Sequence, residues 1–281
     1  MKKTVTIIGL GLIGGSMAID LRKRGFAGKL IGVDINPTHA AAAKTIGLID
    51  AEMSLAEAMP QSDLIIVATP VNATIKLLPE VLDLVDRHVV TDVASTKGEI
   101  VAAVTNHPKR RRFVASHPMA GTENSGPWSA LSGLYDGKAA IICDSRDSDD
   151  DAVDLVERMY AALYMRCLRM ESHEHDVHVA YVSHISHVSS FALALTVLAK
   201  EKDKKNIFDL ASGGFSSTVR LAKSGSAMWT PIFMKNRDNV LTVLDTYLTY
   251  LNQFREALQQ GDEERLDDLI REANTIRRVL N

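Results

Sequence analysis

The sequence predicts an α/β fold followed by an all-α domain, and three observations support this prediction. Short runs of β-branched residues alternate with helix-like segments through the first two-thirds of the chain, which is typical of a parallel sheet with crossover helices. A glycine-rich turn follows the first of these runs at Gly9. From Ser172, a suitable helix N-cap, long amphipathic helices replace the strand-like runs. We therefore predict two domains, residues 1–171 and residues 172–281.

The expected strands are short and mostly apolar on both faces, which indicates burial inside a sheet. They are Thr4–Ile8, Leu30–Asp34, Leu64–Ala68, Val89–Asp92, Phe113–Ser116, Ala139–Cys143 and Tyr164–Met170. The helices expected between them are Ser16–Arg24, His39–Ile46, Ile75–Leu84, Lys97–Val104 and Asp151–Leu163. Near the C-terminus an apolar helical stripe comprises Leu266, Leu269, Ile270, Ala273, Ile276 and Leu280. Such stripes predict that the helical domain is a dimerisation domain, and hence a homodimer.

The composition is that of an ordinary globular protein. The chain has 281 residues, of which 46% are hydrophobic and 24% charged, which excludes a disordered chain. A net charge of −3 gives no reason to expect a nucleic-acid partner. Only Cys143 and Cys167 are present, so we expect a reducing, cytoplasmic location without a disulfide framework. No stretch approaches the roughly 20 apolar residues of a membrane span, and no membrane partner is expected.

The glycine-rich turn has the sequence Gly-Leu-Gly-Leu-Ile-Gly from Gly9 to Gly14, between a strand and a helix. Glycines at these positions permit a tight turn, close approach to a pyrophosphate and close helix packing. This is the fingerprint of a Rossmann-type doubly wound sheet, and the helix N-terminus faces the phosphates. Asp34 ends the second strand about 20 residues later, where a carboxylate binds the ribose hydroxyls. A 2′-phosphate would meet that negative charge, so the sequence favours NAD over NADP.

A second group of polar residues follows two later strands. Ser116 to Glu123 reads Ser-His-Pro-Met-Ala-Gly-Thr-Glu directly after a strand, and Asp92 to Lys97 ends another strand with the hydroxyl of Ser95. Substrates meet the cofactor at the carboxyl ends of strands in open α/β sheets. A histidine there, His117, can act as a general base near neutral pH, although a histidine after a strand is often only structural.

The helix after Ser172 is rich in histidine and carries a narrow polar face. Asp176, Ala180, Ser183 and His187 share that face at 100° per residue, which suits a pocket wall. No HExxH motif occurs, and the histidines have no nearby thiol, so we predict no metal site. Further on, Gly213 begins a glycine turn that leads to Arg220, whose guanidinium can bind a carboxylate.

Five segments, in their order and spacing, resemble the prephenate and arogenate dehydrogenase family. They are the glycine turn, Asp92–Lys97, Ser116–Glu123, the histidine-rich helix and Gly213–Trp229. The resemblance covers nearly the whole chain and implies NAD-dependent oxidative decarboxylation of prephenate to 4-hydroxyphenylpyruvate, in tyrosine biosynthesis. It implies that His117 is the catalytic histidine and that Ser95 helps to hold the ring hydroxyl and the nicotinamide. It also implies an intertwined homodimer.

The resemblance supplies the remaining site residues. His187 joins the catalytic group, and the substrate-binding residues it implies are Arg220, Glu123, Ser183, Gly213 and Trp229. The expected cofactor-binding residues are Gly9, Gly11, Leu12, Ile13, Gly14, Asp34, Thr69 and Ser95. One departure concerns the helix motif, which reads SHLPH in many members and has Ser186 in place of the proline here. Loss of that proline should straighten the helix.

Three alternatives stay open on the sequence. Arogenate differs from prephenate only in an amino group for a keto group, and no residue decides between them; tyrosine inhibition is equally unreadable. A β-hydroxyacid dehydrogenase would use a lysine with a nearby asparagine, as in Lys235 and Asn239, but these are more simply two polar neighbours on an exposed helix. A non-catalytic NAD-sensing module would need neither His117 nor Arg220.

Overall fold

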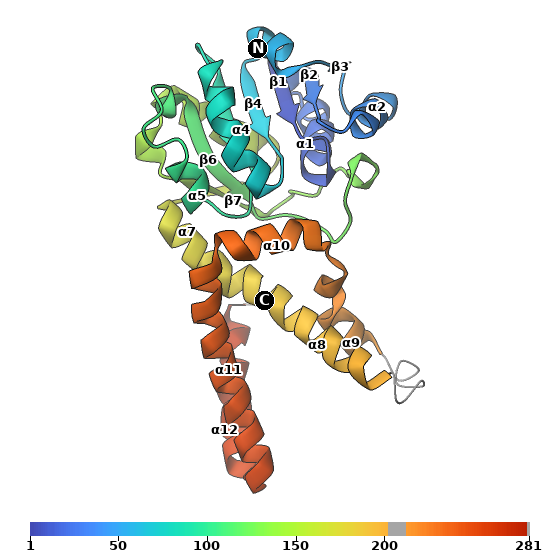
Figure 1. Cartoon of the computed structure of the whole chain (residues 1–281), viewed down its shortest axis with the longest axis vertical. Helices are drawn as coiled ribbons and strands as arrows, with labels where there is room; N and C mark the ends of the chain where they lie inside the picture. The colour runs from blue at the N-terminus through green and yellow to red at the C-terminus, as the bar shows by residue number, and fades with distance from the viewer. Residues whose placement is uncertain (202–211, 280–281) are drawn as a thin grey trace. The chain divides into compact units, whose positions relative to one another are not determined.

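The structure, a computed structural model, describes residues 1–201 and 212–279. It divides into two compact units, Met1–Asn236 and Arg237–Asn281 (Figure 1). Leu280, the last residue of the predicted apolar stripe, lies outside the described residues.

The first unit is built on one eight-stranded sheet with the order β3-β2-β1-β4-β5-β6-β7-β8. The strands are β1 Lys3–Ile8, β2 Ala27–Val33, β3 Ala51–Glu52, β4 Leu64–Val67, β5 Val89–Asp92, β6 Phe113–Pro118, β7 Ala139–Cys143 and β8 Arg166–Met170. All neighbouring strands are parallel except β7, which runs antiparallel to β6. The chain reverses its direction of travel between β1 and β4, and this switch point is where ligands bind in open α/β sheets.

Helices and single turns connect and follow the strands. Between strands lie α1 Leu12–Lys23, α2 Pro37–Thr45, α3 Leu55–Ala58, α4 Val71–Asp83, α5 Gly98–Ala102 and α6 Asp150–Ala162, with the short turns η1 Met59–Gln61, η2 Arg110–Arg112, η3 Pro127–Ser129 and η4 Ser145–Asp147. After β8 come α7 Ser172–Val179, η5 Ala180–His184, α8 Ile185–Glu201, α9 Gly213–Thr218, η7 Arg220–Lys223 and α10 Ser226–Lys235. In Figure 1, α7 and α10 lie beyond the edge toward which the parallel strands point.

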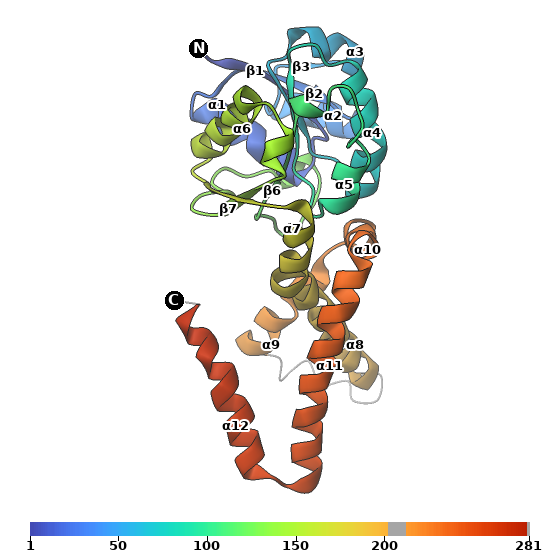
Figure 2. The same cartoon turned by 90° about the vertical axis from the view of Figure 1, so that its left-hand side faces the viewer.

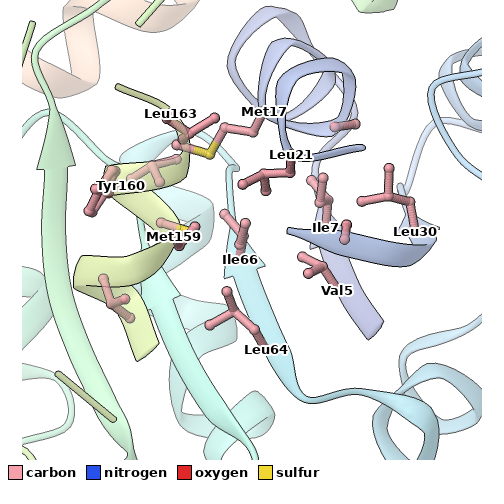
Figure 3. Packing of buried hydrophobic residues seen from close by; sticks show 14 of the residues in the cluster. Val5, Ile7, Met17, Leu21, Leu30, Leu64, Ile66, Met159, Tyr160 and Leu163 are labelled. Carbon is pink, nitrogen blue, oxygen red and sulfur yellow. The ribbon is translucent and has the colours of Figure 1, made fainter. Parts of the chain in front are cut away.

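The sheet is covered on both faces, and alternate strand residues point to opposite cores. Val5, Ile7, Leu64 and Ile66 join Met17 and Leu21 of α1 and Met159 and Tyr160 of α6 in one apolar cluster (Figure 3). Ile8, Ile65 and Val67 join residues of α4 and α5 in the other. Continuous burial on both faces explains why β4 is apolar throughout instead of alternating with polar residues.

The predicted architecture is confirmed, and the differences from it are local. Every expected strand is present within a few residues of its predicted bounds. β3 and α3 were not predicted, because two and four residues are too few to produce a periodic pattern. The single long helix expected after Ser172 is interrupted by a π-helical turn, η5, just before the position where the proline of SHLPH is missing. Removal of the proline therefore does not give a regular helix here.

The second unit is a helical hairpin, α11 Arg237–Gln260 and α12 Glu263–Asn274, followed by η8 Thr275–Arg278. Gly261 turns the chain with a φ of 65°, which favours glycine, and Asp262 caps α12 by accepting the N–H of Arg265. Figure 2 shows that α11 leads into this turn and that α12 leads back from it on the same side, so the chain runs in opposite directions in the two helices. Leu251, Leu258 and Ile270 are exposed along the hairpin.

One helical stretch, Ser172–Lys200, is long and apolar enough to cross a membrane by length and composition alone. The expectation that no stretch approaches that length was therefore wrong. Its first half carries buried polar side chains that contact the sheet unit, among them His175 and Asp176. Its second half exposes Leu195 and Leu198.

Candidate active site

The glycine turn after β1 forms a cradle that requires glycine at Gly9 and Gly14. Gly9 has a φ of 95°, and a Cβ there would lie 2.5 Å from the Ala68 carbonyl oxygen at the end of β4. A Cβ on Gly14 would lie 2.1 Å from the Gly9 oxygen. A Cβ on Gly11, in contrast, would meet no protein atom within 4 Å. The turn is therefore closed toward the sheet and open at Gly11, where a pyrophosphate can approach.

The first turn of α1 is the natural phosphate-binding element of this cradle. Gly11 is its N-cap and provides no side-chain cap, so the N–H groups of the first turn, which include those of Leu12 and Ile13, are free to face an anion. Asp34 lies beside the turn, where its Oδ2 accepts the N–H of Leu10 at 2.8 Å and its Oδ1 accepts that of Asn36 at 2.8 Å. These bonds fix the carboxylate at the end of β2, beside the glycine turn. The cradle therefore fits a dinucleotide.

Thr69 and Ser95 continue the same edge of the sheet. Thr69 follows β4, borders Gly9 and shares a hydrogen bond of 2.8 Å with the hydroxyl of Thr74. Ser95 follows β5 and is half-buried. The hydroxyl of the adjacent Thr96 is buried and has no hydrogen-bond partner among the described residues, so this edge has an unsatisfied polar group next to the predicted nicotinamide position.

His117 lies near the carboxyl end of β6 and is 8% exposed. Its Nδ1 is 2.9 Å from Nε2 of His175, and the two rings meet at 71°. Burial lowers the pKa of His117 well below its ordinary value, and the neighbouring His175, Lys97 and His184 lower it further. The ring is therefore neutral at physiological pH, which a general base requires.

A buried ion pair supports the strand ends on which His117 and Ser95 lie. Lys97 and Asp92 are fully buried and in direct contact, and Lys97 Nζ also donates to the Ser116 carbonyl at 2.8 Å. Asp92 accepts the N–H groups of Ala94 and Ser116 at 3.0 and 3.2 Å. The bonds of Lys97 and Asp92 to Ser116 join the end of β5 to β6, so the pair fixes the geometry of this edge.

Two buried residues that contact Asp176 were not assigned a role from the sequence. His175 is fully buried and contacts Asp176 Oδ1 through Nδ1 at 2.8 Å. Asn236 is 4% exposed; its Nδ2 donates to the Asp176 carbonyl at 2.7 Å and lies 3.1 Å from His184 Nδ1. Nothing in the helical pattern separates His175 from the exposed His178 on the same helix, which explains why it was missed.

His187 and Trp229 form a second part of the site. The two rings are stacked at 3.4 Å with 25° between their planes, and His184 meets Trp229 edge-on at 5.9 Å. His187 Nδ1 lies 3.0 Å from the Ser183 carbonyl. Burial lowers the pKa of His187, and the positive charge of nearby Arg220 lowers it further. Burial also lowers the pKa of His184, to about 4. Both histidines are neutral near pH 7, so they add no positive charge to this part of the site.

Arg220 and Glu123 are paired across 97 residues of sequence. Arg220 Nη1 is 3.2 Å from Glu123 Oε2, and the guanidinium is 53% exposed. Ser190 of α8 binds the Thr218 carbonyl and the Ala222 N–H, at 3.0 and 3.1 Å, and so fastens η7, which carries Arg220. Gly213 begins α9 on the exposed side of this segment. The guanidinium keeps donors for a second carboxylate.

Lys235 and Asn239 do not share one helix, so their interpretation as exposed i,i+4 neighbours was wrong. α10 ends at Lys235 and α11 begins at Arg237. Lys235 Nζ lies 2.7 Å from Glu99 Oε2 and so joins α10 to α5. Among the described residues, no group of three His, Cys, Asp or Glu side chains is placed to hold a metal ion.

A dinucleotide cradle at the switch point, with a neutral histidine on the same edge, defines the class of nucleotide-dependent dehydrogenases. Comparison with known families narrows this class. Residues 17–168 match the family described as prephenate dehydrogenase, nucleotide-binding domain. Residues 171–272 match the one described as prephenate dehydrogenase, dimerization domain. The chain belongs to the prephenate dehydrogenase family.

Individual relatives agree along nearly the full chain. Prephenate dehydrogenase of Bacillus subtilis is 31% identical over 274 residues, 95% of this chain and 73% of the relative. A crystal structure of prephenate dehydrogenase from A. aeolicus, in complex with hydroxyphenyl propionate and NAD+, has a TM-score of 0.90 at 32% identity and covers 100% of this chain and 99% of that one. Synechocystis arogenate dehydrogenase has a TM-score of 0.77 at 27% identity, with 99% and 100% covered.

Proposed function

We propose that this protein catalyses the NAD-dependent oxidative decarboxylation of prephenate to 4-hydroxyphenylpyruvate. The observation that carries this proposal is His117, a buried and neutral histidine at the strand edge that also holds the dinucleotide cradle. The similarity to prephenate dehydrogenases along both domains supports it.

The cradle would hold NAD through groups that the structure places there. The open side of Gly11 and the first turn of α1 suit the pyrophosphate, and Asp34 suits the ribose hydroxyls. Thr69 and Ser95 border the nicotinamide side of the same edge. When bound, NAD+ supplies the acceptor for the hydride from the hydroxyl-bearing carbon.

His117 takes up the proton of the substrate's ring hydroxyl as that carbon is oxidised. Burial keeps the ring free of a proton until substrate arrives, and Ser95 orients the hydroxyl toward it. No general acid is needed at the carboxylate that leaves as CO2, because its departure makes the ring aromatic. The enzyme must therefore orient the substrate, provide a base and hold a cation in a fixed position.

Arg220 binds a carboxylate of the substrate. Its pairing with Glu123 supports this role, because the guanidinium already binds one carboxylate there and such bonds are charge-assisted. Ser183, Gly213, His187 and Trp229 complete this wall of the site. Trp229 Nε1 is buried and has no partner among the described residues, so it is available to a ligand oxygen.

Arogenate is the second candidate substrate. His187 is neutral, and its Nδ1–H donates to the Ser183 carbonyl, which leaves a lone pair on Nε2. Such an acceptor suits the ammonium group of arogenate, and the Synechocystis relative is an arogenate dehydrogenase. A paired assay of NADH formation with prephenate and with arogenate tests both proposals: turnover of prephenate supports the first, turnover of arogenate alone supports the second, and turnover of neither refutes both.

The helical part is proposed to form a cytoplasmic homodimer. Leu195 of α8 and Leu258 of α11 are each 67% exposed. Exposed apolar side chains of this kind are typical of surfaces that a partner covers. Because residues 171–272 match a dimerization domain, we propose that a second copy covers these faces and that the functional boundary between domains lies near residue 171. Light scattering that shows a monomer at micromolar concentration contradicts this proposal.

A further inference from the structure

Three buried side chains form a continuous hydrogen-bonded row that ends at the proposed base. His117 Nδ1 is 2.9 Å from His175 Nε2, and His175 Nδ1 is 2.8 Å from Asp176 Oδ1. The exposed fractions of these residues are 8%, 0% and 6%. Water therefore does not compete for these bonds, and their directions depend only on which partner carries each hydrogen.

Asp176 fixes the direction of the whole row. Its Oδ1 accepts the N–H of Lys97 at 2.8 Å, and its Oδ2 accepts that of Gly98 at 2.8 Å. Burial raises the pKa of Asp176, but the hydrogen bonds from His175, Gly98 and Lys97 outweigh burial and hold it below the ordinary value. An ionised carboxylate only accepts hydrogen bonds. His175 Nδ1 must therefore carry a hydrogen.

The remaining protonation states follow from that one for the uncharged form of His175. With its single ring hydrogen on Nδ1, His175 has a lone pair on Nε2, so His117 Nδ1 must donate to it. His117 Nε2 then has the lone pair, and this is the nitrogen not occupied by the row. The opposite tautomer of His117 would leave two lone pairs facing each other at 2.9 Å.

We propose that His175 and Asp176 are positioning residues that hold His117 in the tautomer whose Nε2 accepts the substrate's hydroxyl proton. This inference rests on the proposed role of His117 as base. The proton comes from the substrate hydroxyl and stays on His117 Nε2, while the hydride and CO2 leave as described above. Asp176 remains ionised throughout and stabilises the imidazolium through His175.

The row also opposes the positive charge of Lys97. This side chain lies just before α5 and disfavours protonation of His117. Asp92 neutralises Lys97 directly. Asp176 is the carboxylate that reaches His117 through a hydrogen-bonded partner, so it offsets the cost of a charged ring at the moment of proton transfer.

Replacement of His175 separates a positioning role from a structural one. His175→Phe keeps a buried ring but removes the acceptor, whereas the Oε1 of His175→Gln can still accept from His117. We expect kcat to fall roughly 10²–10⁴-fold in His175→Phe, with at least a tenfold recovery in His175→Gln and with KM and the Kd for NAD+ little changed. His178→Phe, an exposed neighbour on the same helix, is the matched control. Equal kcat values in wild type and His175→Phe, or equal losses in Phe and Gln, would overturn the proposal.

The tautomer can also be read without any turnover. Nitrogen NMR of 15N-histidine-labelled protein should show His117 protonated at Nδ1 and unprotonated at Nε2, with His117→Asn used to assign the signal. A hydrogen on Nε2 in the wild type contradicts the proposal even if the variants do not fold. This outcome can be distinguished from failure of the proposed function. If only the proposed function is wrong, the protein will show the expected tautomer of His117 but will oxidise neither prephenate nor arogenate.

Discussion

The two halves of the site are built in opposite ways. The cofactor half is local in sequence: the glycine turn, the first turn of α1 and Asp34 lie within the first βαβ unit, and the longest bond among them spans 24 residues. The catalytic half joins residues 58, 60, 79 and 97 positions apart. The first half functions through glycines that lack side chains and through one carboxylate, Asp34, that is close to them in sequence. The second half functions through polar side chains that only the completed fold brings together.

This contrast predicts that substitutions in the catalytic half abolish turnover while binding of the cofactor survives. His117→Asn should lower kcat/KM by roughly 10²–10⁴-fold, because the general base is lost. Calorimetry should show an unchanged Kd for NAD+. The exposed His178→Asn serves as control, and a variant of His117 with wild-type turnover would remove the base from the mechanism.

Arg220→Ala should have the next largest effect, mainly a raised KM. Because the guanidinium is 53% exposed, solvent screens its bond to a carboxylate, and we expect a loss of about 1.5–3 kcal/mol in kcat/KM. The matched control is Lys235→Ala, which removes a cation bound to Glu99 outside the row at His117. A larger effect of Lys235→Ala than of Arg220→Ala would favour a β-hydroxyacid dehydrogenase.

Two glycine substitutions test the cofactor half. A Cβ at Gly14 would lie 2.1 Å from a backbone oxygen, so Gly14→Ala should lower the free energy of unfolding by about 1–3 kcal/mol. A Cβ at Gly11 would meet no protein atom within 4 Å, so Gly11→Ala should fold normally but bind NAD+ about tenfold more weakly, or roughly 1.4 kcal/mol. Thermal unfolding and NAD+ titration of both variants separate the two effects, and a Gly11→Ala protein with wild-type affinity would exclude the proposed pyrophosphate position.

Asp34→Asn should have the smallest effect, on the choice of cofactor. The wild type should use NAD+ with a higher kcat/KM than NADP+, because a 2′-phosphate would meet the carboxylate. Removal of that charge should narrow the preference by about 1 kcal/mol at low ionic strength. Steady-state kinetics with both cofactors measures the change; equal use of NADP+ by the wild type would contradict the role of Asp34.

The same contrast explains what the sequence could predict. Local patterns gave the strands and the cradle from Gly9 to Asp34, because each depends on residues that are neighbours in the chain. His117 and Arg220 were candidates from their local sequence context, and the resemblance gave them specific roles; these roles remain predictions. His175 and Asn236 were missed because a helical period does not reveal which histidine faces a strand 58 residues earlier, nor that the residue after Lys235 is buried against Asp176. No sequence signal predicted the π-helical turn, because the missing proline favoured a straight helix instead.

The pH dependence of kcat/KM tests the assignment of His117 most directly. A buried base is active when unprotonated, and burial disfavours its charged form, so its pKa lies well below the ordinary value. Activity should therefore stay level as the pH falls through about 6.5, the ordinary pKa of histidine, and should decline only at lower pH. In His117→Asn the residual activity should lack this acid limb. An acid limb centred at or above 6.5, or one that persists unchanged in His117→Asn, would contradict His117 as the general base.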